Sequence, residues 1–323
     1  MRSISDTLYI LPDDYFDHLL TFLPYSSVES IKHIIRLQRS TTFRINTLRV
    51  NNEQAILNQL MKTNRFKPVD ILKNCYQFEK NCDKSIINKD FVKEGLIYIQ
   101  SVSSMIPPVI LSPLLDENIL DIAASPGSKT SQMAALSANK AFIDAVEPDF
   151  IRMERLKKNM SVLGCNNINF FKSYGEKFNP QKKYDRILAD LPCSGEGRFN
   201  IYDRSSYINW SLSQINKLSN LQKKILRNCF GLLKTGGLMV YSTCTLNPIE
   251  NELVVDNLIS ENAGKIEIVP PPASFFRLNE FVEPLKSYQG IMINPQVYKK
   301  TLKFVPSERM EGFFIACFRK ISD

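Results

Sequence analysis

Apolar, strand-like runs alternate with amphipathic helices from residue 118 onward, and this alternation constrains the fold more than any other feature. Strands are expected at 119–123, 140–146, 168–171, 184–189, 237–241, 266–269 and 312–318, and helices at 129–137, 150–163, 212–233 and 248–259. Strands that are separated by helices form a mostly parallel sheet that is covered on both faces. Ligands of such sheets bind at the carboxyl ends of the strands, so the loops there are the expected location of a site.

The first hundred residues follow a different pattern. Their apolar residues predict two short helices within 12–39, a strand over 42–48, a helix over 52–61 and short strands between 66 and 99. A chain of 323 residues is long enough for about two domains. We therefore expect a small α+β domain at 1–100 and a larger α/β domain at 101–323.

Charge and cysteine content restrict the class of protein. The net charge is +8 and the isoelectric point is near 9.0, which suits a polyanionic partner such as RNA but also occurs in many unrelated cytosolic proteins. The seven cysteines lack close pairing, and His18 and His33 are the only histidines, so we expect no zinc site, reduced thiols and a cytoplasmic location. Neither a signal peptide nor a membrane span is expected, because no run of about 20 apolar residues occurs.

The first strand of the alternating region runs into a turn of small residues. The sequence DIAASPGSKTSQ (121–132) places Gly127 in the turn between this strand and the next helix. Small residues let the backbone approach a ligand closely. The glycine spacing matches neither the GxGxxG fingerprint nor the loop that ends in Gly-Lys-Ser/Thr, so an ordinary strand–helix turn is the alternative.

An acidic residue ends the second strand. Glu147 follows the first loop by about 20 residues, the spacing at which a carboxylate holds ribose hydroxyls in dinucleotide-binding sheets. Asp144 and Asp149 are the neighbouring alternatives, and an acid in a solvated loop is the other interpretation.

Two later strands each run into a loop that carries a cysteine. Cys193 lies in ADLPCSGEG (189–197), and Cys244 lies in YSTCTLNPIENE (241–252). Pro248 is expected at the first position of a helix with Glu250 and Glu252 in its first turn. The positive end of this helix, or a neighbouring cation, would lower the pKa of Cys244. A buried apolar cysteine is the alternative for Cys244, and a structural disulfide is the alternative for the pair.

Two thiols after adjacent strands are suited to methylation of cytosine at carbon 5. That carbon is a poor nucleophile, but a thiolate that adds to carbon 6 turns the ring into an enamine that can attack a methyl sulfonium. The proton at carbon 5 must then leave and the thiol must be expelled, which requires a second group near the ring. Asp190 could hold the cytosine edge, and a partly protonated carboxyl there could donate to the ring nitrogen.

Aromatic and basic residues follow the loop of Cys193. We expect Arg198 and Phe199 beside a base that has been taken out of its stack. Tyr207 and Trp210 either belong to the same surface or anchor the helix that begins at Leu212.

Together these motifs resemble those of the RNA 5-methylcytosine methyltransferases of the Rsm/Nop/Sun type, and among them the bacterial small-subunit ribosomal RNA enzymes (RsmF type) most of all. The similar stretches are FRINTL (43–48), GLIYIQSVSSM (95–105), DIAASPGSKTSQMAA (121–135), ADLPCSGEGRF (189–199), YSTCTLNPIENE (241–252) and GFFIACFRK (312–320). The resemblance implies a seven-stranded Rossmann-like sheet of the S-adenosylmethionine-dependent methyltransferases, with an RNA-binding α+β domain at 1–100 and a catalytic domain at 101–323.

The resemblance also implies roles for individual residues. Cys244 would be the nucleophile and Cys193 would help to release the product. Asp190 would face methionine or cytosine, with Lys129 near the same site, and Glu147 would hold the ribose of the cofactor. The other cofactor contacts would come from Ala123, Ala124, Ser125, Pro126, Gly127, Ser128 and Lys129, and from Tyr174 in place of the acid that usually meets the adenine amine.

The expected activity is therefore S-adenosylmethionine-dependent methylation of a cytosine in ribosomal RNA through a covalent cysteine–cytosine adduct. Transfer RNA is the alternative substrate. A non-catalytic RNA-binding factor of ribosome assembly is the alternative function, and Tyr174 is its support. The implied partner is RNA, without a metal or a membrane, and the protein is expected to be a monomer.

Overall fold

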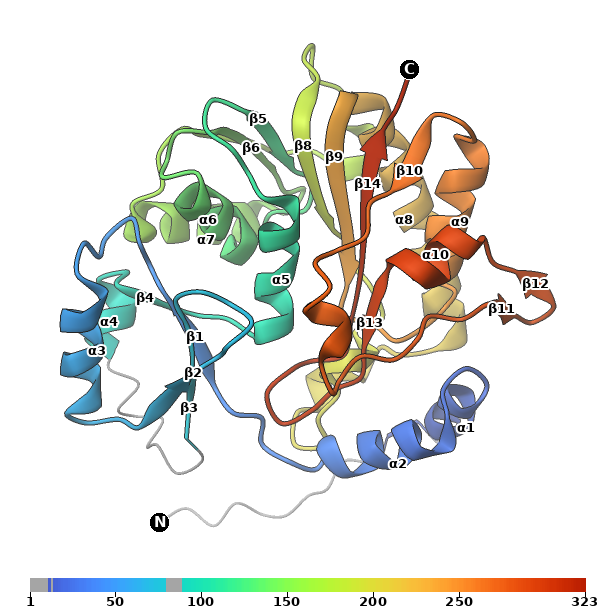
Figure 1. The fold of residues 1–323 in the computed structure, drawn as a ribbon, viewed down its shortest axis with the longest axis horizontal. Coiled ribbons are helices and arrows are strands. Elements are labelled where there is room, and N and C mark those ends of the chain that lie inside the picture. The colour runs from blue at the N-terminus through green and yellow to red at the C-terminus, as the bar shows by residue number, and fades with distance from the viewer. Residues whose placement is uncertain (1–10, 13, 80–88) are drawn as a thin grey trace.

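The computed structural model describes residues 11–12, 14–79 and 89–323, and its centre is a large sheet (Figure 1). Seven strands lie side by side in the order β10–β14–β9–β8–β5–β6–β7, and β13 pairs with β14 as an eighth. The bounds are β5 (Asn118–Asp121), β6 (Phe142–Val146), β7 (Ile168–Phe171), β8 (Tyr184–Asp190), β9 (Leu233–Thr243), β10 (Ile266–Ile268), β13 (Leu302–Phe304) and β14 (Phe313–Lys320).

Strand direction places the loops of interest at one edge of the sheet. The strands β5, β6, β7, β8 and β9 are parallel, whereas β14 runs antiparallel between β9 and β10. The predicted seven-stranded, mostly parallel sheet is therefore confirmed. The carboxyl ends of β5, β6, β8 and β9 meet at the same edge, as parallel pairing requires.

Helices pack on both faces of this sheet. They are α5 (Val102–Leu111), α6 (Ser128–Leu136), α7 (Phe150–Leu163), α8 (Leu212–Leu232), α9 (Glu252–Glu261) and α10 (Pro295–Lys300). Ile119 of β5 shares a core cluster with Met133 of α6, while the next residue, Leu120, shares another with Leu226 of α8. Successive side chains of a strand point to opposite faces, so β5 is buried on both sides, which explains its continuous apolar sequence.

The helix that follows the Cys244 loop begins later than the sequence indicates. Pro248 was the expected first position, but residues 248–251 form a turn and α9 begins at Glu252. The predicted interaction of Glu250 with the first turn of a helix is therefore wrong, because Glu250 lies in the turn and is fully buried. Glu252 does begin the helix, but it is also buried and forms an ion pair with Lys303 at 2.9 Å.

A small antiparallel sheet forms a separate layer near the N-terminal part of the chain (Figure 1, blue to cyan). Its order is β2–β3–β1–β4, with β1 (Thr42–Ile45), β2 (Phe66–Pro68), β3 (Cys75–Phe78) and β4 (Ile97–Ile99), and it is accompanied by α3 (Glu53–Met61) and α4 (Lys89–Lys93). Phe43 and Leu60 belong to its own apolar core. The short strands predicted between 66 and 99 are found as β2, β3 and β4, while residues 80–88 lie outside the described ranges.

The first two helices pack on the large sheet instead of the small one. α1 (Tyr15–Leu20) and α2 (Tyr25–Ile34) contribute Tyr15 and Ile31 to the core cluster that contains Leu120 of β5. The ring of Tyr15 lies 4.9 Å from that of Phe199 and 5.4 Å from that of Trp210, between their centroids. The domain boundary at residue 100 stays a prediction, but α1 and α2 share their core with residues beyond it.

Arg44 of β1 connects the small sheet to α6. Its Nη2 donates to Ser131 Oγ at 2.7 Å and its Nε donates to Gln100 Oε1 at 2.9 Å. Burial lowers the pKa of Arg44 to about 10. A buried guanidinium requires these hydrogen bonds, so the small sheet cannot move relative to α6 without breaking them.

The described residues contain neither a membrane-spanning helix nor a metal-binding cluster. Among them, no helix is both apolar and long enough to cross a membrane. In the same ranges, no group of three or more His, Cys, Asp or Glu side chains is arranged to hold a metal ion.

Candidate active site

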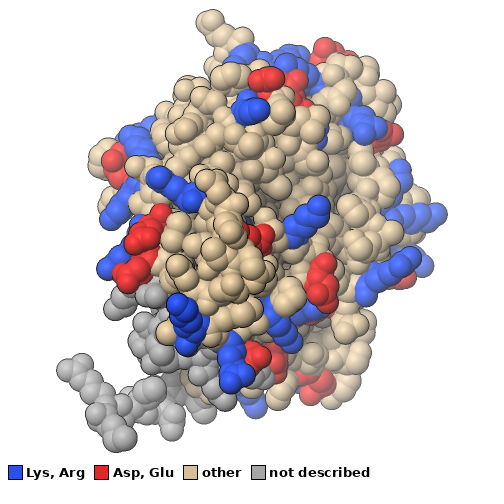
Figure 2. Space-filling view, turned by 60° about the vertical axis from the view of Figure 1, so that its left-hand side comes forward, with Lys and Arg blue, Asp and Glu red and all other residues tan. Residues whose placement is uncertain are grey.

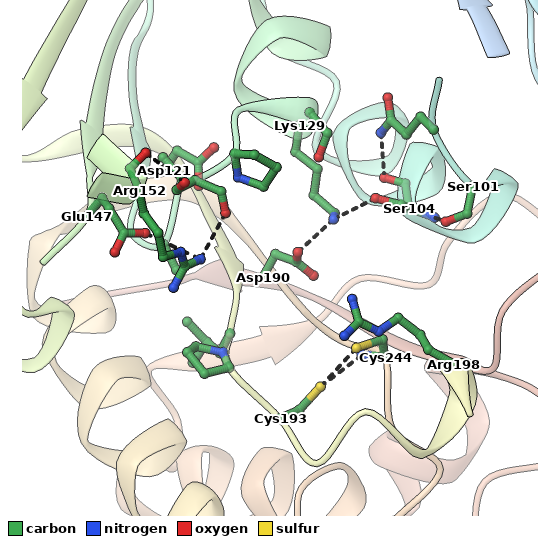
Figure 3. A pocket seen from close by; sticks show the side chains of 18 of the residues that line it. Ser101, Ser104, Asp121, Lys129, Glu147, Arg152, Asp190, Cys193, Arg198 and Cys244 are labelled. Carbon is green, nitrogen blue, oxygen red and sulfur yellow. Dashed lines mark hydrogen bonds and ion pairs between the residues drawn. The ribbon is translucent and has the colours of Figure 1, made fainter. Parts of the chain in front are cut away.

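A cavity of about 570 Å³ opens at the carboxyl ends of β5, β6, β8 and β9 (Figure 3). The segment between β4 and α5 and the start of β14 close its other side. Of the predicted site residues, those that line the cavity are Ala123, Ala124, Ser125, Pro126, Ser128, Lys129, Glu147, Asp190, Cys193 and Cys244. Gly127 and Tyr174 do not line it.

Gly127 lets the loop after β5 pack closely against α7. Its φ is +101°, and a Cβ there would lie 2.4 Å from Met160 Cε of α7. Any other residue would be strained at this φ, and the side-chain ends of Met160 and Leu156 would have to shift to make room for it. Arg152 of α7 fixes the loop further, because its Nη2 donates to the Ser125 carbonyl (3.1 Å) and its own carbonyl accepts from Ser125 Oγ (2.9 Å).

Glu147 is the acid after β6 that reaches the cavity. One of its oxygens accepts from the Asp149 N–H (3.0 Å) and the other pairs with Arg152 (3.4 Å). Asp144 points elsewhere and accepts from Tyr184 Oη at 2.7 Å, while the side chain of Asp149 caps α7. Of the three acids considered from the sequence, only Glu147 lines the cavity, where a buried carboxylate fits a pair of ribose hydroxyls.

Asp121, the last residue of β5, is a cavity residue that the sequence prediction missed. Its carboxylate accepts from Thr130 Oγ1 at 2.7 Å, and burial raises its pKa to about 6. The signal was an acid that ends an apolar strand immediately before the small-residue loop. Other polar lining residues that were not predicted include Ser101, Ser104, Arg152 and Glu311.

Tyr174 lies outside the cavity wall. It follows β7 directly before a short 3-10 helix, Gly175–Lys177, and its side chain is 59% exposed. Lys177 Nζ lies 5.6 Å from the centre of its ring. The position therefore presents an aromatic ring to solvent just beyond the carboxyl end of β7.

Lys129 and Asp190 form an ion pair across the cavity floor (Figure 3). Lys129 Nζ donates to Asp190 Oδ2 at 2.6 Å and to Ser104 Oγ at 2.7 Å. The other oxygen of Asp190 accepts from Ser242 Oγ at 2.7 Å. Both oxygens are thus acceptors, and a donor role of Asp190 toward a ring nitrogen would require one of these bonds to change.

The two loop cysteines lie in contact. Pairing of β8 with β9 sets Asp190 opposite Ser242, which brings the two loops side by side. Cys193 Sγ and Cys244 Sγ are 3.2 Å apart and point toward one another (Figure 3). A disulfide bond would be about 2.05 Å long, and both cysteines are free thiols.

The two thiols differ in acidity. A hydrogen bond from Cys193 lowers the pKa of Cys244, and the guanidinium of Arg198 lowers it further. The same hydrogen bond and burial raise the pKa of Cys193 well above its usual value. Cys244 therefore ionises more readily than Cys193. The predicted cause, a helix N-terminus, is wrong because α9 begins only at Glu252.

Glu196 joins the two cysteine loops. It is fully buried, and its oxygens accept from Trp210 Nε1 (2.9 Å), Asn247 Nδ2 (3.2 Å) and Thr245 Oγ1 (3.1 Å). Asn247 also contacts His18 Nε2 of α1 at 2.7 Å, and burial lowers the pKa of this histidine. Helix α1 therefore supports the loop of Cys244 through Asn247.

Three of the aromatic residues after Cys193 are buried in the core, whereas Tyr202 is exposed. Phe199 is fully buried, so the expectation that it lies beside an extruded base is wrong. Tyr207 and Trp210 are also buried and belong to the same core cluster. Arg198 does line the cavity, next to Cys244.

Comparison with known proteins gives consistent relationships. Residues 108–319 match the family "16S rRNA methyltransferase RsmB/F". The chain is 34% identical to the tRNA (cytosine(49)-C(5))-methyltransferase of Pyrococcus abyssi, over 86% of this chain and 88% of that protein. It is also 34% identical to the ribosomal RNA small subunit methyltransferase F of Shewanella woodyi, over 87% of this chain but only 57% of that protein.

A solved structure agrees with these relationships. The crystal structure of a methyltransferase homologue from Pyrococcus horikoshii superimposes with a TM-score of 0.76 at 30% identity, over 96% of this chain and all of that one (100%). Sequence match, sheet order and the loop positions of Cys193 and Cys244 lead to one assignment: the chain belongs to the RsmB/F family of RNA cytosine-5 methyltransferases.

Proposed function

We propose that this protein methylates carbon 5 of a cytosine in ribosomal RNA through a covalent adduct with Cys244. The observation that supports this most directly is the contact between Cys193 and Cys244, in which one sulfur is activated by the other. Addition to carbon 6 needs a thiolate nucleophile, and the later expulsion of that thiolate needs a thiol beside it.

S-adenosylmethionine, the methyl donor of this family, supplies an electrophilic methyl group. The cavity fits it, because a buried carboxylate and a glycine-shaped loop lie side by side at the ends of β5 and β6. Glu147 would hold the ribose hydroxyls, and the loop 123–129 would lie against the rest of the molecule. Tyr174 stays a prediction for contact with the adenine.

The attack begins at Cys244. Its thiolate forms a bond to carbon 6 of the base, and the electron pair of the 5,6 double bond then makes carbon 5 nucleophilic toward the methyl group. The proton that the ring nitrogen needs for this step would come from the Lys129–Asp190 pair, which lines the same cavity. The ring nitrogen returns this proton after release.

Release of the product breaks the bond between Cys244 and carbon 6. The proton on carbon 5 leaves to a base, for which Asp190 is the carboxylate on the same loop as Cys193. The electron pair of that carbon–hydrogen bond restores the 5,6 double bond, and the pair of the carbon–sulfur bond returns to Cys244. The Cys193 thiol, whose sulfur lies 3.2 Å from that of Cys244, would donate a hydrogen bond to this departing thiolate.

Transfer RNA is the second candidate substrate, and the 34% identity to the transfer RNA enzyme of Pyrococcus abyssi supports it. The chain spans most of the Pyrococcus transfer RNA enzyme (88%) but little more than half of the Shewanella ribosomal enzyme (57%). A non-catalytic role in ribosome assembly has less support, because Tyr174 lies outside the cavity and the cysteine pair is intact.

The proposal also includes the RNA-binding surface, the oligomeric state and the location of the protein. The small β1–β4 domain would bind RNA, with the protein acting as a monomer in the cytoplasm. On the face that Figure 2 shows, basic and acidic side chains are intermixed, so RNA would be held by several separate basic contacts there.

The direct test is methyl transfer from radiolabelled S-adenosylmethionine to unmodified small ribosomal subunits and, in parallel, to unmodified transfer RNA. Bisulfite sequencing of RNA from cells with and without the gene then names the cytosine. We expect one ribosomal cytosine to lose its methyl group. A protein that binds the cofactor but labels neither RNA would overturn the proposal.

A further inference from the structure

Two buried side chains hold the peptide groups on both sides of Cys193. Glu250 accepts from the Ser194 N–H with both oxygens, at 3.0 and 3.3 Å. Gln222 Nε2 of α8 donates to the Pro192 carbonyl at 2.8 Å and to Glu250 Oε1 at 3.0 Å. Glu250 and Gln222 are both 0% exposed. The residues immediately before and after Cys193 are therefore fixed by one connected pair.

This arrangement is energetically costly. A buried carboxylate that is bonded by amide N–H groups loses much of its hydration, and burial raises the pKa of Glu250 to about 7. The amide nitrogen of Gln222 donates to both the Pro192 carbonyl and Glu250. The amide oxygen of Gln222 is buried and has no hydrogen-bond partner among the described residues. Polar groups that are kept inside at such a cost need a reason beyond packing.

Glu250 belongs to the other cysteine's loop. It lies in the turn that follows Cys244, where its carbonyl accepts from Tyr241 Oη of β9 and its N–H donates to the Asn247 carbonyl (3.2 Å). Its side chain crosses to the Cys193 loop, so the distance between the two sulfurs depends on this carboxylate. Beside it, Ser194 Oγ and Thr245 Oγ1 make a second link at 2.7 Å.

We propose that Glu250, together with Gln222, is a positioning residue for Cys193, and that it serves release of the methylated RNA more than methyl transfer. This inference rests on the proposed function. At a pH where Cys244 is ionised, its bond to carbon 6 can form without Cys193 in place, because Arg198 also lowers the pKa of this thiol. Expulsion of Cys244 needs the Cys193 thiol at hydrogen-bond distance at any pH. A displacement of about 1 Å in such a group costs on the order of 100-fold in rate.

The test separates the two steps in single-turnover reactions with the unmodified form of the RNA that the enzyme methylates. Methyl groups in RNA are counted after protease treatment, and covalent RNA–protein adduct is counted on denaturing gels. The reactions are run at a pH where Cys244 is ionised in each variant, as its alkylation profile shows. In Glu250→Ala, we then expect methyl transfer within about threefold of wild type and adduct decay about 10- to 100-fold slower. Glu250→Gln keeps an acceptor for the Ser194 N–H, so its adduct should decay faster than that of Glu250→Ala.

Gln222→Met and Ser219→Ala complete the design. Gln222→Met removes the donor to the Pro192 carbonyl and should also accumulate adduct, and it carries the test if Glu250→Ala does not fold. Ser219→Ala is the matched control, because Ser219 Oγ donates from the same helix to the same turn, at the Ile249 carbonyl (2.7 Å), without touching a neighbour of Cys193. Thermal melts with and without S-adenosylmethionine establish folding.

The outcomes distinguish this inference from the proposed function. If Cys193→Ala accumulates adduct while the Glu250 and Gln222 variants release it at the wild-type rate, the positioning role is wrong and the function stands. Equal accumulation in Ser219→Ala, or equal loss of transfer and release in Glu250→Ala, also overturns the positioning role. If wild type makes no methylated RNA and Cys193→Ala makes no adduct, the proposed function is wrong.

Discussion

Cys193 Sγ and Cys244 Sγ lie 3.2 Å apart although 51 residues separate them in the chain. The pairing of β8 with β9 makes this contact, and buried carboxylates on both loops maintain it. The two sulfurs are chemically different in this arrangement, and the predictions below depend on that difference.

Substitution of each cysteine should block a different step. Cys244→Ala removes the nucleophile, so neither methyl transfer nor an adduct is expected. Cys193→Ala keeps the nucleophile but lacks the group that assists its expulsion, so a denaturant-resistant RNA–protein adduct should accumulate. Cys165→Ala, at a half-buried thiol that does not line the cavity, is the control. Retained turnover in Cys244→Ala would contradict the assignment.

Cys193 should also control the acidity of Cys244. The pKa of Cys244 is lowered first by the hydrogen bond from Cys193, so Cys193→Ala should raise it. Iodoacetamide modifies the thiolate, so alkylation of Cys244 in this variant should require a higher pH than in wild type. Mass spectrometry of the Cys244 peptide between about pH 6 and pH 10 measures the shift. An unchanged profile would show that Cys193 does not donate to Cys244.

Gly127 should be intolerant of a side chain. Gly127→Ala would place a Cβ 2.4 Å from Met160 Cε at a φ of +101°, so a loss of on the order of 1–3 kcal/mol in the free energy of unfolding is expected, together with weaker cofactor binding. Gly231→Ala in α8 is the control, because a Cβ there meets nothing within 4 Å. That control should be stabilised by up to about 1 kcal/mol. Urea unfolding and calorimetry provide both measurements.

Glu147 should contribute to cofactor affinity. Glu147→Gln removes the charge from a buried acceptor in the cavity, and hydrogen bonds to charged groups are worth about 1.5–3 kcal/mol, so S-adenosylmethionine should bind about 10- to 100-fold more weakly. Glu154→Gln, at a surface ion pair with Lys157 on the same helix, should leave affinity unchanged. Isothermal titration calorimetry measures the affinity of each variant for S-adenosylmethionine. Equal affinities in the two variants would show that Glu147 does not contact the cofactor.

Glu250 should make stability depend on pH. Burial raises its pKa to about 7, so between its usual value and pH 7 the folded protein holds a proton that the unfolded chain has lost. Its contribution to stability is therefore fully present below the unfolded pKa and is lost as the pH rises toward 7. Glu250→Gln should flatten the slope of unfolding free energy by up to about 1.4 kcal/mol per pH unit in that window. Identical slopes in urea titrations of the two proteins would refute this.

Much of the fold could be predicted from local patterns. Helix 150–163 and strand 168–171 were predicted with the bounds that α7 and β7 have, because periodicity and end signals lie within the segments themselves. The glycine loop after β5 and the acid after β6 were predictable for the same reason. Their positions follow from strand order alone, since parallel strands end at one edge.

The misplaced residues share a physical cause. Pro248 is a good first residue for a helix, but Glu250 is drawn inward to the Ser194 N–H of another loop, and α9 starts only afterwards. Phe199 looked available to a base, yet Tyr15 of α1 covers it. In both cases a partner that is distant in sequence decided the outcome, and no local propensity contains that partner.

The sequence by itself determined the order of strands and helices, the residues in each terminal loop and the presence of two cysteines beyond adjacent strands. Only the tertiary structure decided which thiol has the lowered pKa, that Glu250 holds the Cys193 loop and that His18 of α1 contacts the Cys244 loop at Asn247. Periodicity and turn chemistry act over a few residues, whereas acidity and position within a site depend on burial and on hydrogen bonds that form only when the sheet brings distant segments together.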